Sequence, residues 1–134
     1  MFKGPLGGMI YVPNVVNSVK FYKDILGFEF GGYWDAEKCV MEWDKKEQPF
    51  YAGFNIDGSH FGIHPAEPNH VVGSSIEFYR VVDNADDYYK KVKQNGGVCT
   101  APEDTVWGAR LFMIKDPSGH AWGFYHMKDP THYS

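Results

Sequence analysis

The sequence has little of what marks several large classes of protein. It contains only two cysteines in 134 residues, Cys39 and Cys99, which excludes a disulfide framework, and we expect both thiols to be reduced. It has no apolar run of the length that a membrane-spanning helix needs, and residues 1–9 carry no apolar signal-peptide core. We therefore expect a soluble protein of the cytoplasm that does not act at a membrane.

The sequence also lacks an excess of basic charge. Its formal net charge is −4 at pH 7, and nucleic-acid binding needs a basic face, so we expect no nucleic-acid partner. The histidines at 60, 70, 120, 126 and 132 form no i, i+4 pair on a predicted helix, so we expect no helical metal motif, and neither a nucleophile elbow nor a phosphate-binding glycine loop occurs. These absences remove the commonest sequence signatures of catalysis.

What the sequence does have is an internal repeat and many aromatic residues. Residues 16–23 reappear in blurred form as residues 82–89, at an offset of 66. A strand-like run precedes each copy, at 9–12 and at 75–79. Aromatic residues make up 17% of the chain, which suits both a large core and an aromatic-walled pocket. Two copies of one module also predict a groove where the copies meet, and grooves bind ligands.

Each copy is predicted to continue into a helix. Val19, Tyr22 and Leu26 lie at the spacing of one helix face. The predicted N-terminal caps are Asn17 or Ser18 in the first copy and Asp83 or Asn84 in the second. The predicted strands after the helices are 28–30, 39–44, 50–56 and 59–64, and the second copy has strands at 74–82, 98–100, 110–115 and 120–126. The prediction is one α+β domain over 1–134, with repeats at about 7–65 and 74–127.

Two segments resemble the vicinal oxygen chelate superfamily, which holds glyoxalase I, extradiol dioxygenases and the fosfomycin- and bleomycin-resistance proteins. They are SVKFYKDILGF at 18–28 and DPSGH at 116–120. The segment WGARLF at 107–112 is similar to the bleomycin-resistance branch in particular. The resemblance implies two βαβββ modules that form a cup, and a homodimer.

The resemblance also bears on metal binding. Enzymes of this superfamily hold a divalent metal through His, Glu or Gln at up to four strand positions. In this chain those positions fall on Gly7, on or beside His64, on Glu77 and on Gly123. Glycine has no ligand atom, and a divalent ion usually needs three or four protein ligands. We therefore expect no metal or other cofactor; if a metal is present, its ligands are His64 and Glu77.

Alternation along the strands selects candidate ligand-binding residues. Glu77 shares a strand face with Tyr79, where a carboxylate either binds a ligand or forms a structural bridge to Arg110. His64 ends a strand and is either a surface histidine or a polar contact at the mouth of the groove. The glycines at 7, 62 and 123 are expected to leave room for a ligand. The predicted ligand-binding residues are Trp107, Glu77, Tyr11, Tyr79, Arg110, Tyr125 and His64.

Three functions follow from these residues and from the resemblance. The favoured one is metal-independent binding of a small aromatic or cationic molecule, with protection by sequestration as in antibiotic resistance. The alternative is a metal-dependent lyase, isomerase or dioxygenase that adds ligands such as His60 or His126 to His64 and Glu77. The third is a dimeric interaction domain without a small ligand. The sequence names neither the ligand nor the reaction.

Overall fold

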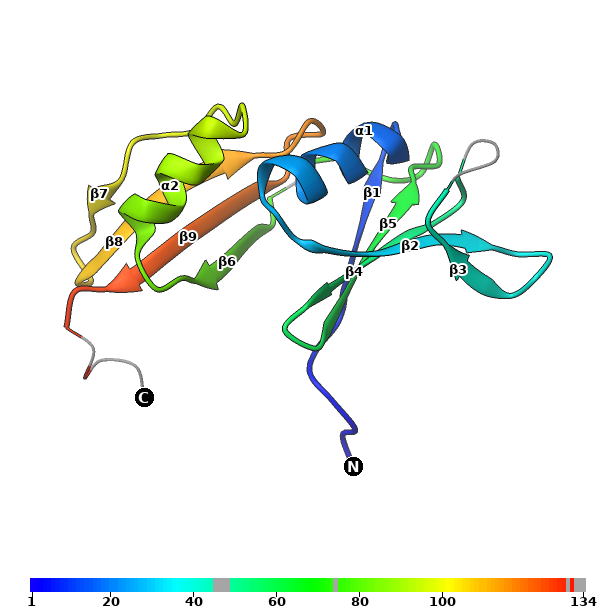
Figure 1. The fold of residues 1–134 in the computed structure, drawn as a ribbon, viewed down its shortest axis with the longest axis horizontal. Coiled ribbons are helices and arrows are strands. Elements are labelled where there is room, and N and C mark those ends of the chain that lie inside the picture. The colour runs from blue at the N-terminus through cyan, green and yellow to red at the C-terminus, as the bar shows by residue number, and fades with distance from the viewer. Residues whose placement is uncertain (45–48, 74, 130, 132–134) are drawn as a thin grey trace. The chain divides into compact units, whose positions relative to one another are not determined.

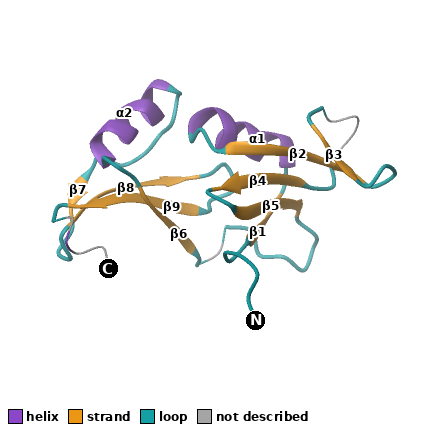
Figure 2. Cartoon of the chain, turned by 60° about the horizontal axis from the view of Figure 1, so that its bottom comes forward, coloured by secondary structure: helices purple, strands orange, loops and turns teal. Residues whose placement is uncertain are grey.

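The computed structural model describes residues 1–44, 49–73, 75–129 and 131. The chain divides into two compact units, residues 1–72 and 73–134. Each unit has a mixed β-sheet with a helix on one face, so the α+β class and the two modules are confirmed (Figure 1, Figure 2). None of the described helices is long and apolar enough to cross a membrane.

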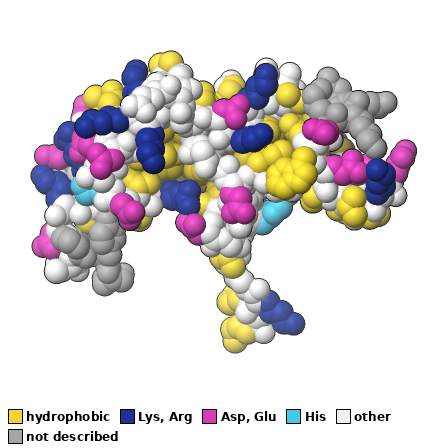
Figure 3. Space-filling view, viewed as in Figure 1, with side chains coloured by type: hydrophobic (Ala, Val, Ile, Leu, Met, Phe, Trp, Pro, Cys, Tyr) yellow, Lys and Arg dark blue, Asp and Glu magenta, His cyan; other side chains and the backbone are white. Residues whose placement is uncertain are grey.

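The first unit has a five-stranded sheet in the order β1-β5-β4-β2-β3, in which β1 runs parallel to β5 and the other pairs are antiparallel. Its elements are β1 (Gly8–Val12), α1 (Val15–Lys20), the π-helical turn η1 (Phe21–Ile25), β2 (Glu29–Asp35), β3 (Val40–Glu42), β4 (Ala52–Ile56) and β5 (Ser59–Pro65). The N-terminal end of the chain extends away from this sheet (Figure 3), and Met1, Phe2 and Leu6 are exposed.

The second unit has a four-stranded sheet in the order β6-β9-β8-β7, with β6 parallel to β9. Its elements are β6 (Glu77–Val81), α2 (Ala85–Gln94), β7 (Glu103–Asp104), β8 (Ala109–Lys115) and β9 (Ala121–Met127). Most predicted strands are present with shifted ends. The predicted strand 98–100 is only an isolated bridge from Cys99 to Ile114, whereas β7 was not predicted. The strand predicted at 74–82 begins at Glu77, and Ser74 lies outside the described residues.

Each unit has its own core between the helix and one face of the sheet. Val19, Tyr22 and Leu26 are all buried, which confirms the predicted helix face. In the second unit, the core contains Ala85 and Val92 from α2 and the rings Phe112 and Phe124 from β8 and β9. Since side chains alternate along a strand, burial of one set of residues leaves the intervening set on the face that the helix does not cover.

The observed starts of the two helices change the offset between equivalent residues of the two repeats. The first helix is capped by Asn14, whose Oδ1 accepts a hydrogen bond from Asn17 N at 3.0 Å, so the predicted caps Asn17 and Ser18 are wrong. Asn84 caps α2 in the same way, with Asp87 N as donor at 3.0 Å. The equivalent residues are therefore 70 positions apart, not 66. Val15 is buried directly after the first cap, and this places the start of the helix.

Candidate functional site

The open face of the second sheet presents its side chains in rows across three strands. Because β9 lies between β6 and β8, the register puts Glu77, Ala121 and Lys115 in one row. The next row holds Tyr79, Gly123 and Met113. The opposite face is covered by α2 and carries the buried rings of Phe112 and Phe124. The central strand thus contributes only small residues to these two rows.

A connected run of polar and aromatic side chains crosses this open face. The Tyr79 hydroxyl donates to Glu77 Oε1 at 3.4 Å. The ring centroids of Tyr79 and Tyr125 lie 6.4 Å apart, and those of Tyr125 and Trp107 lie 5.2 Å apart at an interplanar angle of 77°. Tyr79 and Trp107 each keep 49% of their surface exposed. Four of the seven predicted ligand-binding residues are therefore brought together.

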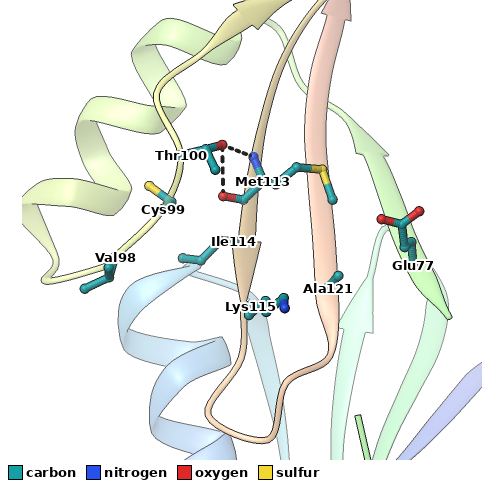
Figure 4. Close-up of a pocket in the computed structure, with 8 residues that line it drawn as sticks. All are labelled: Glu77, Val98, Cys99, Thr100, Met113, Ile114, Lys115 and Ala121. Atoms are coloured by element: carbon teal, nitrogen blue, oxygen red, sulfur yellow. Dashed lines mark hydrogen bonds between the residues drawn. The ribbon is translucent and has the colours of Figure 1, made fainter. Parts of the chain in front are cut away.

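A pocket of ≈ 530 Å³ lies at the Glu77 end of this run (Figure 4). Its lining residues are Glu77, Val98, Cys99, Thr100, Met113, Ile114, Lys115 and Ala121. The Thr100 hydroxyl accepts a hydrogen bond from Met113 N at 2.9 Å and donates to Met113 O at 3.3 Å, which ties residues 98–100 to the edge of β8. These two bonds fix one wall of the pocket, while β6 supplies the opposite wall.

The local surroundings raise the pKa of two of these groups, the Tyr79 hydroxyl and the Cys99 thiol. Desolvation raises the pKa of the Tyr79 hydroxyl, and the charge of Glu77 and their hydrogen bond raise it further. Desolvation also raises the pKa of the Cys99 thiol, against a smaller opposite effect of Lys93. Tyr79 is therefore a hydrogen-bond donor to Glu77 and not a second anion, and the charge at this end of the pocket comes from the carboxylate.

The glycines predicted to leave room for a ligand do not do so. A Cβ on Gly123 would lie 2.5 Å from Tyr79 Cε1 and 3.0 Å from Met113 Sδ. A Cβ on Gly62 would lie 2.5 Å from the Tyr51 hydroxyl oxygen, and one on Gly7 would meet the carbonyl oxygen of His60 at 3.1 Å. The space over Gly62 and Gly123 is filled by tyrosine rings of the same unit. The pocket beside Glu77 is lined by Ala121 rather than by one of these glycines.

Arg110 lies on the other face of the sheet from Glu77. Its guanidinium binds Asp86 of α2 at 3.2 Å and Asp104 of β7 at 3.3 Å. The hydrogen bond and charge of Asp86 raise the pKa of the guanidinium, with a smaller contribution from Asp104. The structural bridge predicted between Glu77 and Arg110 is therefore wrong, because alternation along β8 sends Arg110 toward the helix.

The two remaining predicted residues belong to the first unit. Tyr11 and His64 are register partners on the parallel strands β1 and β5, with ring centroids 5.4 Å apart. The Tyr11 ring also stacks on His70 at 3.7 Å, and Phe50 lies 4.6 Å from His64. This cluster is an aromatic surface of the first sheet, and each ring in it already has a ring partner.

The residues that could hold a metal do not form a ligand set. Among the described residues, no group of three or more His, Cys, Asp and Glu is placed to hold an ion. His60 Nε2 is hydrogen-bonded to the Tyr51 hydroxyl, His64 Nδ1 lies 2.7 Å from Pro65 O, and His126 Nδ1 accepts from Ala85 N at 2.8 Å. His126 also pairs in register with Arg110, on the face opposite Glu77. Gly123 is closed to any donor side chain by Tyr79. Within each unit, the described residues therefore bring no three such donors together.

Sequence reasoning missed Lys115, Met113 and Thr100 as pocket residues. Alternation along 110–115 was available and places Met113 and Lys115 on the face opposite Arg110. The missing information was the pairing across the turn at 116–119, which sets Lys115 beside Ala121. Thr100 lies beyond the sheet edge in an irregular segment, and no local pattern marks its place.

Two modules, each with a mixed β-sheet and a helix on one face, define the fold class of this protein. Residues 8–124 match the family model of the Glyoxalase/Bleomycin resistance protein/Dioxygenase superfamily, and the chain belongs to that superfamily. This confirms the resemblance seen in the sequence. No curated protein sequence matches the chain significantly.

Solved structures show the same fold at low identity. TnmS3, described as an antibiotic binding protein from Streptomyces sp. CB03234, has a TM-score of 0.70 at 17% identity, over 96% of this chain and 98% of its own. TioX from Micromonospora sp. ML1 has a TM-score of 0.69 at 16% identity, over 92% and 99%. A superfamily member from Sphaerobacter thermophilus DSM 20745 has a TM-score of 0.69 at 18% identity, over 94% and 99%.

Proposed function

We propose that this protein binds a small aromatic or cationic molecule, without a metal ion, and acts by sequestering it. The observation that carries the proposal is the run Glu77–Tyr79–Tyr125–Trp107 beside the ≈ 530 Å³ pocket on the open face of the second sheet. The antibiotic binding protein among the similar folds supports the same class of function. An antibiotic is therefore the first kind of ligand to test.

The geometry suits a flat ligand with a positive charge. Trp107 and Tyr79 are half exposed and offer ring faces and edges, and stacking contributes about 0.5–1.5 kcal/mol beyond the area that is buried. Glu77 supplies a carboxylate whose position is fixed by the Tyr79 hydroxyl. A cation bound there gains a charge contact, and a rim position is worth up to about 1 kcal/mol.

Binding without chemistry fits the side chains of the open face better than the enzyme alternative does. The candidate ligand His64 and the two extra ligands, His60 and His126, are engaged in hydrogen bonds, and His126 lies on the helix-covered face. The Tyr79 hydroxyl is protonated near neutral pH even at the ordinary tyrosine pKa, and its pKa is raised further, so it is a poor general base. The side chains at the pocket bind and orient a ligand; they are not arranged to move protons.

The test begins with a thermal-shift screen of cationic and aromatic antibiotics, followed by calorimetry with each compound that raises the melting temperature. We expect Trp107→Ala and Glu77→Gln each to weaken binding about three- to tenfold, from the loss of one stacking or one charge contact. The double variant should lose about one to two orders of magnitude. Metal analysis of protein purified without chelators belongs to the same experiment.

Matched controls come from the first unit. Trp43→Ala removes another exposed indole and Glu67→Gln another exposed carboxylate, and neither should change the affinity. If both pocket variants bind within a factor of two of the wild type, the open face is not the site. If metal analysis finds about one metal ion per chain, and this ion is lost in Glu77→Gln, the result would favour the metal-dependent enzyme over the binding function.

We further propose that the protein acts as a homodimer in the cytoplasm. Exposed apolar side chains outside the ligand-binding run, such as Val81 of β6, support a covering partner. The free thiols Cys39 and Cys99 are compatible with a reducing compartment.

A further inference from the structure

One row of the open face carries opposite charges on either side of a gap. Glu77 on β6 and Lys115 on β8 are both register partners of Ala121 on β9, and all three line the same pocket. Neighbouring strands lie about 4.8 Å apart, so the Glu77 and Lys115 backbones are separated by roughly 10 Å. The methyl group of Ala121 is the only side chain between them in this row.

The two charges do not neutralise each other. The Glu77 carboxylate accepts a hydrogen bond at 3.4 Å from the hydroxyl of Tyr79, which belongs to the same strand. Within the part of the chain that the structure describes, Lys115 Nζ forms neither an ion pair nor a hydrogen bond. The row thus offers a fixed negative group and an unpaired positive group at opposite ends of one pocket.

The remaining lining residues are apolar or uncharged. Met113 lies on the floor, and Val98 and Thr100 form the wall beyond β8, held by the two hydrogen bonds between Thr100 and the Met113 backbone (Figure 4). A ligand that spans the row therefore meets a carboxylate, a small apolar gap and an ammonium group in turn. A purely cationic ligand would leave Lys115 close to its own positive charge, which is unfavourable.

We propose that the pocket selects amphoteric ligands, with a cationic group for Glu77 and an anionic group for Lys115 about 10 Å apart, as at the two ends of a short peptide-like molecule. The inference rests on the proposed binding function and narrows it from cationic compounds to molecules that carry both charges. It assigns Lys115 as a residue that determines specificity.

The experiment uses four versions of the tripeptide Gly-Trp-Gly: with both termini free, as the C-terminal amide, as the N-acetyl form, and with both ends blocked. An extended tripeptide spans roughly 10 Å. Affinities are measured by chemical-shift titration of the isotope-labelled protein, which also reports on folding. The variants are Lys115→Gln and Glu77→Gln, with Lys90→Gln on the exposed surface of α2 as the charge-matched control.

The free tripeptide should bind the wild type about two- to fivefold more tightly than either singly blocked form, the range of one partly screened charge contact. Lys115→Gln should abolish the preference for the free acid over the amide and leave the affinity for the amide unchanged or raised. Glu77→Gln should abolish only the preference for the free amine. Lys90→Gln should keep both preferences. Because the contacts are electrostatic, both preferences should shrink at high salt.

Three outcomes would overturn the inference: equal affinity of the wild type for the free acid and the amide, a preference that survives in Lys115→Gln, or no shift of pocket resonances with any of the four tripeptides. None of these removes the proposed function. The proposed binding function is tested separately, by the antibiotic screen and by the effect of Trp107→Ala and Glu77→Gln on the compounds that the screen finds. A failure of the amphoteric selectivity can therefore be distinguished from a failure of the binding function.

Discussion

The ring of Tyr79 lies directly over Gly123 on the neighbouring strand. The two residues are register partners on β6 and β9, and a Cβ on Gly123 would approach Tyr79 Cε1 to 2.5 Å. The first unit has a similar arrangement, in which the Tyr51 ring covers Gly62 of the adjacent strand β5. The ring over Gly123 also carries the hydroxyl that positions Glu77, so this close approach connects the packing of the sheet to the pocket.

This relationship predicts a coupled pair of substitutions. Gly123→Ala should reduce the free energy of unfolding by about 1–3 kcal/mol, because the added methyl group displaces the Tyr79 ring. Tyr79→Ala removes the obstacle, so the double variant should be more stable than the sum of the single changes predicts. Denaturant unfolding of all four proteins gives the coupling energy, and additive effects would show that the ring does not depend on the glycine.

Alternation within one strand was enough to predict that Glu77 and Tyr79 share a face, because the period of two is local. The same rule could not show whether the space above Gly123 holds a ligand or a side chain of the protein. That depends on which residue of the next strand stands opposite, and the register follows from turns and pairing. The family resemblance was enough to predict the fold. Predicting which side chains fill the open face would have required the pairing register of the strands.

The helix caps show a second limit of sequence reasoning. Asn14 and Asn17 are equally good caps by residue type, and the structure uses Asn14 because Val15 has to be buried in the first turn. Arg110 shows a third limit. Its long cationic side chain suited a ligand site, but its partners Asp86 and Asp104 come from α2 and β7, and β7 was not predicted.

A further prediction concerns the turn between β8 and β9. The buried Asp116 carboxylate accepts hydrogen bonds from Ser118 N at 2.9 Å and His120 N at 2.8 Å, and His120 Nδ1 lies 3.0 Å from it. Asp116→Ala should lower the free energy of unfolding by about 2–4 kcal/mol, because buried donors lose their acceptor. Asp116→Asn keeps an acceptor oxygen and should cost clearly less. Equal losses in both variants would mean that the charge, rather than the acceptor, holds the turn.

Arg110 should matter for stability and not for binding. Its guanidinium joins Asp86 and Asp104 on the helix-covered side, so Arg110→Met should lower the melting temperature. The affinity for any ligand found in the screen should stay unchanged, since the pocket opens on the other face. Thermal melts and calorimetry of the same variant check the two statements separately. If Arg110→Met lowers the ligand affinity without lowering the melting temperature, the result would show that Arg110 belongs to the ligand-binding site.

The homodimer remains a prediction with a direct test. Light scattering coupled to size exclusion should give a mass near twice the 15.3 kDa of one chain. Substituting exposed apolar residues of an open face, such as Val81→Asp, should shift the equilibrium toward the monomer if that face is covered. A mass of one chain at every concentration would contradict the prediction.

The two cysteines provide a probe of the pocket. Cys99 lies half-buried in the pocket wall and Cys39 is exposed. Because burial raises the pKa of the Cys99 thiol, the thiolate fraction at any given pH is smaller than for an ordinary thiol, and the thiolate is the reactive form. Iodoacetamide should therefore alkylate Cys99 more slowly than Cys39 near pH 8, and its rate should keep rising to higher pH.

Ligand protection completes this experiment. A ligand in the pocket should slow the alkylation of Cys99 and leave Cys39 unaffected, which peptide mass mapping can follow for both thiols in one sample. The single variants Cys39→Ser and Cys99→Ser remove any ambiguity about which thiol reacts. A bound ligand that leaves the Cys99 rate unchanged would place the binding site elsewhere on the protein. Faster alkylation of Cys99 than of Cys39 in the free protein would show that the thiol is not held in a desolvated wall, and the pocket geometry around Thr100 and Met113 would then be wrong.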